Sequence, residues 1–271
     1  MVFEKFLNGF LPIYKRILRI SVRRRSIIIS MIVQPILWMV VLGKTFNNIL
    51  GGSPFGAEYD YLTYLACGVI TMTVLFSSLF GGMTLLFDKE FGMMKEFLVA
   101  PIPRSTIPLG NGAGIATRSL FQAILVLLLG LAIGAKFELS LYKILPMLFA
   151  IILVSLGLFG LTAAIAAKIE SFEGFQGVMQ LTAMPLFFVS GAIYPIVFLP
   201  QGLQEFAKYS PITHVVSIIR YYLIGEKAAN FDVLWGSSHA NIGLFLSFVY
   251  LGFFAVILLS LACWAFKKQT I

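Results

Sequence analysis

Long uncharged stretches, rather than alternating polar and apolar positions, set the pattern of this chain. A helix that crosses a lipid bilayer needs about 20 mostly apolar residues, so the gaps between ionisable side chains mark candidate spans. Six follow in order: Ser26 to Gly43, Tyr61 to Phe87, the stretch between Arg118 and Lys136 with the residues just before it, Ile144 to Ala167, Gly174 to Gln204, and a stretch within Val233 to Phe266. The pattern predicts an all-α integral membrane fold with six transmembrane helices.

The composition supports a membrane protein and excludes several other classes. Of the 271 residues, 59% are hydrophobic and only 12% are charged, with a mean hydropathy of +0.93. A soluble chain carries about 25% charged residues, so this chain could not cover its apolar surface in water. Two cysteines do not make a disulfide scaffold, and the high hydrophobicity excludes a disordered segment.

The distribution of basic residues predicts the orientation. Six crossings place both termini on one side, and that side would carry 14 of the 20 Lys and Arg residues, seven of them before residue 26. Basic residues concentrate on the cytoplasmic side of a membrane protein, so we expect cytoplasmic N- and C-termini. The net charge of +8 therefore reflects topology, and no nucleic-acid partner is expected.

The first 25 residues predict an amphipathic helix at the membrane surface. Apolar residues from Phe3 to Leu18 recur at steps of three and four, with Lys15, Arg16 and Arg19 largely beside that stripe. The basic region is too long for a cleavable signal peptide, and no small-x-small site follows it. Pro12 interrupts the pattern and is expected to kink the helix. The alternative is a simple charged anchor for the first span.

The segment from Asp88 to Arg104 differs from an ordinary connecting loop. Asp88 is placed to cap a short helix, and Pro101 and Pro103 are placed to stop it. We therefore expect a helix over residues 88–100 that docks into a groove on a partner protein, or a tether on the membrane surface. The apolar edge that would dock consists of Met93, Met94, Phe97 and Leu98.

The fifth uncharged stretch is too long for one span and breaks at residues 190–195, which read Ser-Gly-Ala-Ile-Tyr-Pro. The residues after the break are too apolar for a free loop, and irregular backbone at membrane depth needs protein or water to satisfy it. We expect a re-entrant helical hairpin over residues 195–220 on the outer side. Its rim would carry Glu205, Lys208, His214 and Arg220.

The sequence predicts no catalytic, metal or cofactor site in this chain. Gly43-Lys44-Thr45 resembles the end of a phosphate-binding loop, but Trp38 stands where that motif needs another glycine. Cys67 and Cys263 lie in different spans, and His214 and His239 are far apart in sequence, so no metal cluster or nucleophile–base pair is expected. No paired acids lie within the spans, which argues against a proton relay. The glycine pairs Gly110/Gly114 and Gly130/Gly134 are interpreted as helix-packing positions.

Three segments together resemble the membrane subunit of the ABC-2 family of ATP-driven exporters. The first is Gln34-Pro35-Ile36-Leu37-Trp38, after the arginine-rich stretch. The second runs from Phe87 to Arg104 and is similar to the family's inner loop with its Pro-x-x-Arg ending, read here from Pro101 or as the shortened Pro103-Arg104. The third is the 190–195 break followed by Leu199-Pro200, Ser210-Pro211-Ile212-Thr213-His214 and Arg220.

The resemblance implies a division of the chain and a set of functional residues. Residues 1–25 would be the connecting helix, and residues 26–271 the six-span transmembrane domain with a coupling helix at 88–100. The coupling residues would be Asp88, Glu90, Met93, Met94, Phe97, Leu98 and Arg104. The outer gate would be formed by Ser190, Gly191, Tyr194, Pro195, Pro211, His214 and Arg220.

The resemblance also implies partners and a reaction class. Two copies would assemble side by side in the cell membrane, each with a cytoplasmic ABC ATPase that binds ATP and Mg, so this chain itself would not be an enzyme. The expected cargo is an amphipathic drug-like or lipid-linked molecule moved outward. The alternatives are a polysaccharide or glycolipid exporter of the same family, a secondary transporter that works without ATP, and a membrane-embedded lipid-modifying enzyme.

Overall fold

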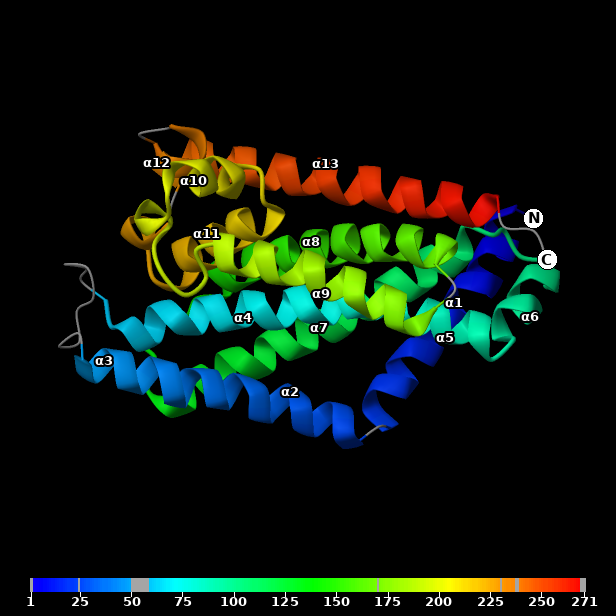
Figure 1. Ribbon diagram of the computed structural model, residues 1–271, viewed down its shortest axis with the longest axis horizontal. Coiled ribbons are helices and arrows are strands. Elements are labelled where there is room, and N and C mark those ends of the chain that lie inside the picture. Colours follow the sequence, from blue (N-terminus) through cyan, green and yellow to red (C-terminus); the bar gives the residue numbers. More distant parts are fainter. Residues whose placement is uncertain are drawn as a thin grey trace.

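Helices run side by side along the long axis of the computed structural model (Figure 1). The structure describes residues 2–23, 25–49, 59–169, 171–229, 231–236 and 239–268, and within these ranges it contains helices and no β-strand. The longest elements are α1 (Val2–Arg23), α2 (Arg25–Leu37), α4 (Tyr61–Leu79), α7 (Thr106–Ile133), α8 (Leu141–Lys168), α9 (Phe172–Val189), α11 (Pro211–Leu223) and α13 (Ala240–Lys267). The shorter elements are η1 (Trp38–Lys44), α3 (Thr45–Ile49), η3 (Phe80–Gly82), α5 (Met83–Glu90), α6 (Met93–Val99), η4 (Ile196–Phe198), α10 (Gln201–Lys208), η5 (Glu226–Ala228) and α12 (Phe231–Trp235).

Four helical stretches are long and apolar enough to cross a membrane: Tyr61–Glu90, Thr106–Ile133, Leu141–Lys168 and Ala240–Lys267. The bent pair Glu4–Arg23 and Ile28–Lys44, whose two helices meet at 64°, raises that number to five if it counts as one span. Helix α9 also packs along α4 but has only 18 residues, including Glu173 and two glutamines. The all-helical membrane fold is therefore confirmed with four or up to five spans, and a sixth crossing stays a prediction.

The two ends of the bundle carry different elements. Figure 1 shows the N-terminal part of α1, the last turns of α13 and helix α6 together at one end, which we call the terminal end. Helices α3, α10 and α12 lie at the other end, called the opposite end. The beginning of α1 and the last turns of α13 thus lie at the same end of the molecule.

Helix α4 lies at the centre of the bundle. Every one of its residues except Phe76 is buried, and α7, α8, α9 and α11 all pack against it. A helix that is apolar all round is stable only when it is enclosed by protein or lipid, and here the enclosing elements are other helices of the same chain. Movements of α4 must therefore displace its neighbours.

Pro35 alters the first predicted span without ending it. A proline removes one backbone donor and its ring clashes with the carbonyl four residues earlier. The helix continues past Pro35 and changes to a π-helical stretch from Trp38 to Lys44, a form that relieves such a misfit. Gly43-Lys44-Thr45 consequently lies in helical backbone and not in a phosphate-binding loop.

Helix α1 packs against a notch in the surface of α7 that Gly110 and Gly114 form. Ile13 and Ile17 of α1 are buried. A Cβ atom added at Gly110 would lie 3.0 Å from Ile13 Cγ2, and one added at Gly114 would lie 2.7 Å from Ile17 Cβ. Small residues spaced four apart allow such close approach, so the packing role predicted for this pair is confirmed. The helix is continuous across Pro12 and packs along α7, and its expected place at the membrane surface stays a prediction.

Filling this notch should detach α1. We predict that Gly114→Leu lowers the free energy of unfolding by about 1–3 kcal/mol, because an overpacked contact costs that much. SDS titration in mixed micelles would measure the effect. The matched control is Gly252→Leu in α13, where an added Cβ meets nothing within 4 Å, and equal stability of the two variants would contradict the packing assignment.

Candidate functional site

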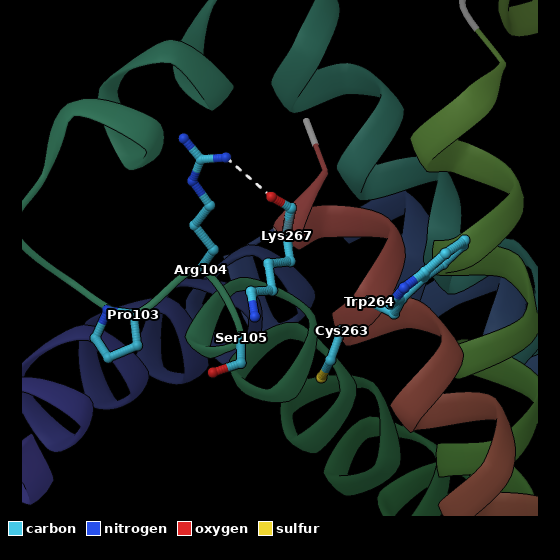
Figure 2. Close-up of a pocket in the computed structure, with 6 residues that line it drawn as sticks. All are labelled: Pro103, Arg104, Ser105, Cys263, Trp264 and Lys267. Atoms are coloured by element: carbon cyan, nitrogen blue, oxygen red, sulfur yellow. Dashed lines mark hydrogen bonds between the residues drawn. The ribbon is translucent and has the colours of Figure 1, made fainter. Parts of the chain in front are cut away.

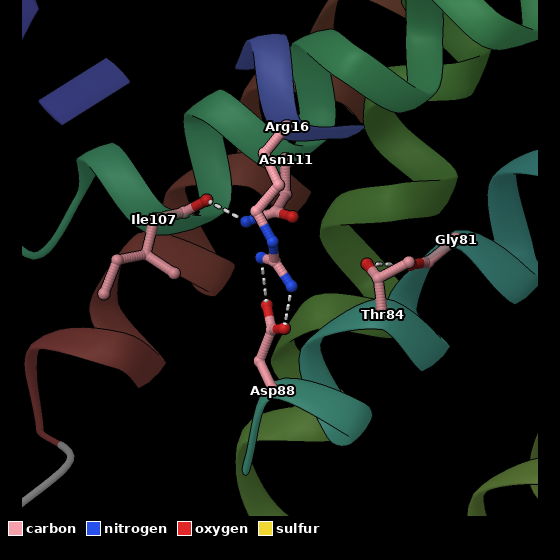
Figure 3. Close-up of polar contacts among 6 residues, drawn as sticks. All are labelled: Arg16, Gly81, Thr84, Asp88, Ile107 and Asn111. Carbon is pink, nitrogen blue, oxygen red and sulfur yellow. Dashed lines mark hydrogen bonds and ion pairs between the residues drawn. The ribbon is translucent and has the colours of Figure 1, made fainter. Parts of the chain in front are cut away.

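Arg16 joins three helices at the terminal end (Figure 3). Its two terminal nitrogens donate to the two carboxylate oxygens of Asp88 in α5, and the Nη1–Oδ2 distance is 2.8 Å. Its guanidinium carbon lies 5.6 Å from the ring centroid of Phe97 in α6. A bidentate arginine–carboxylate pair fixes both distance and orientation, so α1, α5 and α6 are held in one arrangement.

Asp88 does not cap the coupling helix, and that expectation was wrong. Asp88 lies buried inside α5, and α6 begins only after Gly92, whose φ of +78° breaks the helix. Glycine adopts this left-handed conformation at little cost. The carboxylate pairs with Arg16 instead, so the predicted helix over 88–100 is two elements, α5 and the seven-residue α6.

The residues that α6 buries include two of the four predicted to form its exposed apolar edge. Met94 is buried in the apolar cluster that also contains Leu85 and Leu86, and Phe97 is half-buried at Arg16, so these two side chains anchor the helix. The side chain of Leu98 lies outside the described part of the structure.

The exposed edge consists of other residues. Phe91 and Val99 are 78% and 72% exposed, Met93 is partly exposed, and the neighbouring Glu90 is exposed as well. We call Glu90, Phe91, Met93 and Val99 the coupling face. An apolar cluster with an adjacent charge at the tip of a bundle is typical of a protein-docking surface.

Two further basic residues connect this region to the ends of other helices. Lys89 Nζ donates to the carbonyls of Ala166 and Ala167 at 2.6 and 2.7 Å, in the last turn of α8. The carbonyl end of a helix carries partial negative charge and favours a cation. Arg104 donates to the Lys267 carbonyl in the last turn of α13 at 3.1 Å, across the hollow drawn in Figure 2.

At the opposite end, residues 190–195 form a hydrogen-bonded turn that we call the break loop. Ser190 Oγ donates to the Phe187 carbonyl at 2.6 Å and accepts from the Ala192 amide at 3.2 Å. Gly191 has a φ of +72°, and Tyr194 donates to the Phe188 carbonyl at 2.8 Å. Pro195, in extended conformation, precedes η4. The predicted interruption of the fifth stretch is confirmed.

The break loop lies directly on α4. A Cβ atom at Gly68 would lie only 2.0 Å from the Ala192 carbonyl oxygen, so glycine is required for the backbones to approach this closely. The Tyr61 hydroxyl donates to the Ile193 carbonyl at 3.3 Å. Two positions on one helix therefore hold the loop.

Arg220 of α11 completes this contact from the other side. It is fully buried, donates from Nη2 to the Ala192 carbonyl at 2.8 Å, and places its guanidinium carbon 3.5 Å from the ring centroid of Tyr64. Its expected position at the rim was wrong, because a carbonyl and an aromatic face replace the water that the charge gives up. Among the described residues, no carboxylate pairs with it.

His214 is likewise buried and not at the rim. Its ring nitrogens lie 3.0 Å from Ser247 Oγ and 2.9 Å from the Lys208 carbonyl, which links α10 and α11 to α13. Pro211 is buried in the first turn of α11. Glu205 and Lys208 form an exposed ion pair at 2.7 Å, so their predicted surface position is confirmed.

A cavity of about 610 Å³ lies between α1, α2, α4, α5 and α7. Arg118 and Gln122 of α7 line it, one helical turn apart. Arg118 is one of the 14 basic residues expected on the inner side, and it stands in the middle of α7. The available signal was its isolation, since no other charged residue lies between Arg104 and Lys136.

Comparison with known proteins gives one consistent family. A family model described as ABC-2 type transporter matches residues 9–224. The ycf38 protein of Porphyra purpurea is 30% identical over 73% of this chain and 68% of its own length. The inner membrane transport permease YadH of Escherichia coli K12 is 26% identical over 73% of this chain and 77% of its own. Nodulation protein J of Rhizobium leguminosarum is 24% identical over 75% of this chain and 77% of its own length.

The Arg16–Asp88 pair should couple α1 to α5 energetically. In a double-mutant cycle with Arg16→Gln and Asp88→Asn, we predict a coupling energy of about 0.5–3 kcal/mol, the range for side chains in direct contact. SDS titration of the four proteins would measure it. Additive effects of the two substitutions would show that the pair does not hold the helices together.

The absence of a side chain at Gly68 of α4 should control the position of the break loop. We predict that Gly68→Ala pushes Ala192 away from α4 and makes maleimide labelling of an Ile193→Cys reporter several times faster, in a Cys263→Ser background that keeps only the buried Cys67. Gly177→Ala in α9 is the control, because an added Cβ there meets nothing within 4 Å. Unchanged labelling in Gly68→Ala would refute the contact.

Proposed function

Because the chain belongs to the ABC-2 type transporter family, whose members are membrane transport permeases, we propose that it is the permease subunit of an ATP-driven exporter. The ATPase is a separate chain that supplies ATP and Mg binding. Two copies of the permease assemble side by side, and the path moves an amphipathic drug-like or lipid-linked molecule outward.

The observation that carries this proposal is the coupling face at the terminal end. Phe91 and Val99 are highly exposed at the tip of the bundle, beside the charged Glu90. Apolar side chains in this position gain stability when they fill a groove on another protein. The ATPase docks here, and α6 receives its movement.

The contacts behind α6 provide a route for that movement. Arg16 connects α6 and α5 to α1, Lys89 connects α5 to the end of α8, and Arg104 connects the following segment to the end of α13. A displacement of α6 therefore pulls on three long helices at once. Rigid elements joined by charge-assisted contacts are suited to such switching.

The break loop is the outer gate of the proposed path. Tyr61 and Gly68 of α4 hold one side of the loop, and Arg220 of α11 holds the other. Opening requires α4 and α11 to separate, which exposes the Ala192 carbonyl and frees the Arg220 guanidinium. ATP-driven closure at the terminal end shifts the population between the closed and open arrangements.

The proposed orientation places the terminal end in the cytoplasm and the chain in the inner or cytoplasmic membrane. The excess of Lys and Arg on the inner segments supports it. Arg118 was counted on the inner side and Arg220 on the outer side, and both lie inside helices. Leaving them out removes one basic residue from each side, so the inner excess stays the same.

A change of charge on the coupling face should uncouple the transporter. We predict that Glu90→Lys and Val99→Asp each weaken binding of the ABC ATPase that co-purifies with the wild-type chain by at least about tenfold, as expected for a hot-spot residue. Substrate-stimulated ATP hydrolysis in proteoliposomes should fall with binding, while membrane insertion stays intact.

The matched control is Glu226→Lys, the same charge change at an exposed residue of η5 near the opposite end. It should retain wild-type binding and hydrolysis. The proposal is wrong if no ATPase co-purifies with the wild-type chain, if the Glu90 and Glu226 variants behave alike, or if transport runs at full rate without any ATPase.

A further inference from the structure

We propose that the cavity between α1, α2, α4, α5 and α7 binds the acidic head group of an amphipathic molecule, with Arg118 as the main anion-binding residue. The head group is a carboxylate or phosphate, and the apolar body rests on phenylalanine side chains. This inference refines the substrate class of the proposed function and in that respect rests on it.

The charge balance of the cavity leaves one cation without a counterion. Its charged lining residues are Arg16, Asp88 and Arg118. Arg16 and Asp88 neutralise each other in a bidentate pair, whereas the structure records no ion pair for Arg118 within its described ranges, and Arg118 Nε is a buried donor without an acceptor. A charged group at this depth is costly unless an opposite charge meets it.

Two neutral side chains add hydrogen-bonding capacity beside Arg118. Gln122 and Ser77 line the same cavity and are only 7% and 6% exposed. Gln122 Oε1 and Ser77 Oγ have no partner among the described atoms. Buried polar atoms are nearly always paired with protein, water or ligand, so three unsatisfied groups around one cavity point to a polar ligand. The guanidinium group and the serine hydroxyl can donate to an anion together.

The rest of the wall suits an apolar body. Phe76, Phe80 and Phe87 line the cavity, and Phe76 and Phe80 are stacked with ring centroids 6.1 Å apart. Aromatic and methionine side chains offer adaptable apolar contact to acyl chains and rings. The site therefore combines a cationic pole with an apolar surface, which is the complement of an amphipathic anion.

Two sources share this chemistry: a bilayer lipid with an acidic head group, and a transported amphipathic acid. The lining also includes Phe91 and Met93 at the start of α6, which places the cavity beside the terminal end. Either source could supply the anion there, and the experiment separates them.

The test uses dansyl-labelled undecanoic acid, whose fluorescence rises in an apolar site, and its uncharged primary amide. The full chain in detergent should bind the acid about tenfold more tightly than the amide, because only the acid gains the contact with Arg118. Decanoate should displace the bound acid, and decanol should not. This comparison needs no variant, and equal affinity for acid and amide in the wild-type chain would overturn the proposal.

Variants then assign the effect to the cavity. Arg118→Gln should weaken acid binding about tenfold and leave amide binding unchanged, and Arg118→Lys, which keeps the charge, should restore part of the difference. The control is Arg19→Gln, an exposed residue of α1 outside the lining, which removes the same charge from the same end. A loss in Arg19→Gln equal to that in Arg118→Gln would show a general charge effect and refute the site.

The source is decided by mass spectrometry of the purified proteins. Loss of a co-purified acidic lipid in Arg118→Gln identifies a resident lipid, and acid binding without any such lipid identifies a site for the transported molecule. Either result supports the anion site. Neither measurement involves an ATPase, so failure to find a partner ATPase would remove the proposed function while leaving this binding result intact.

Discussion

A guanidinium group that leaves water must recover its lost hydration from other partners, and three arginines of this chain meet that constraint in three ways. Arg16 takes a carboxylate, that of Asp88. Arg220 takes a backbone carbonyl and the face of Tyr64. Arg118 takes no charged partner among the described residues and faces a cavity. The first two arginines fix the ends of the bundle, and the third keeps a buried Nε donor without an acceptor among the described residues.

The two ends are connected by one helical stretch. Tyr61–Glu90 carries Tyr64 and Gly68 at the break loop and Asp88 and Lys89 at the terminal end. The short 3-10 segment Phe80–Gly82 interrupts it, where Gly81 and Gly82 bring Ile115 and Thr162 close to the backbone. Because α4, the first part of this stretch, is enclosed by other helices, a displacement at one end must also move its neighbours.

Much of the fold followed from the sequence because lipid imposes a simple requirement on length and charge. The uncharged stretches located most long helices, and the residues of the break loop marked their own interruption. The positions of charged residues were harder to predict. A charge next to an apolar run was interpreted as an interfacial residue, yet His214 and Arg220 are buried. Their partners are Ser247, Tyr64 and two backbone carbonyls. Neutral partners distant in sequence leave no signal in a charge pattern. Asp88 likewise found its partner 72 residues away.

The π-helical stretch from Trp38 to Lys44 has a mechanical consequence. A π-helical segment holds a surplus residue relative to the α form, and each residue of an α-helix turns it by about 100°. If this stretch relaxed to α-helical pairing, the part of the helix beyond it would rotate about its axis by roughly that angle. Trp38 lies edge-on to Phe187, three residues before the break loop begins. A change between the two helical forms would therefore begin at Trp38, the residue that contacts the ring just before the break loop.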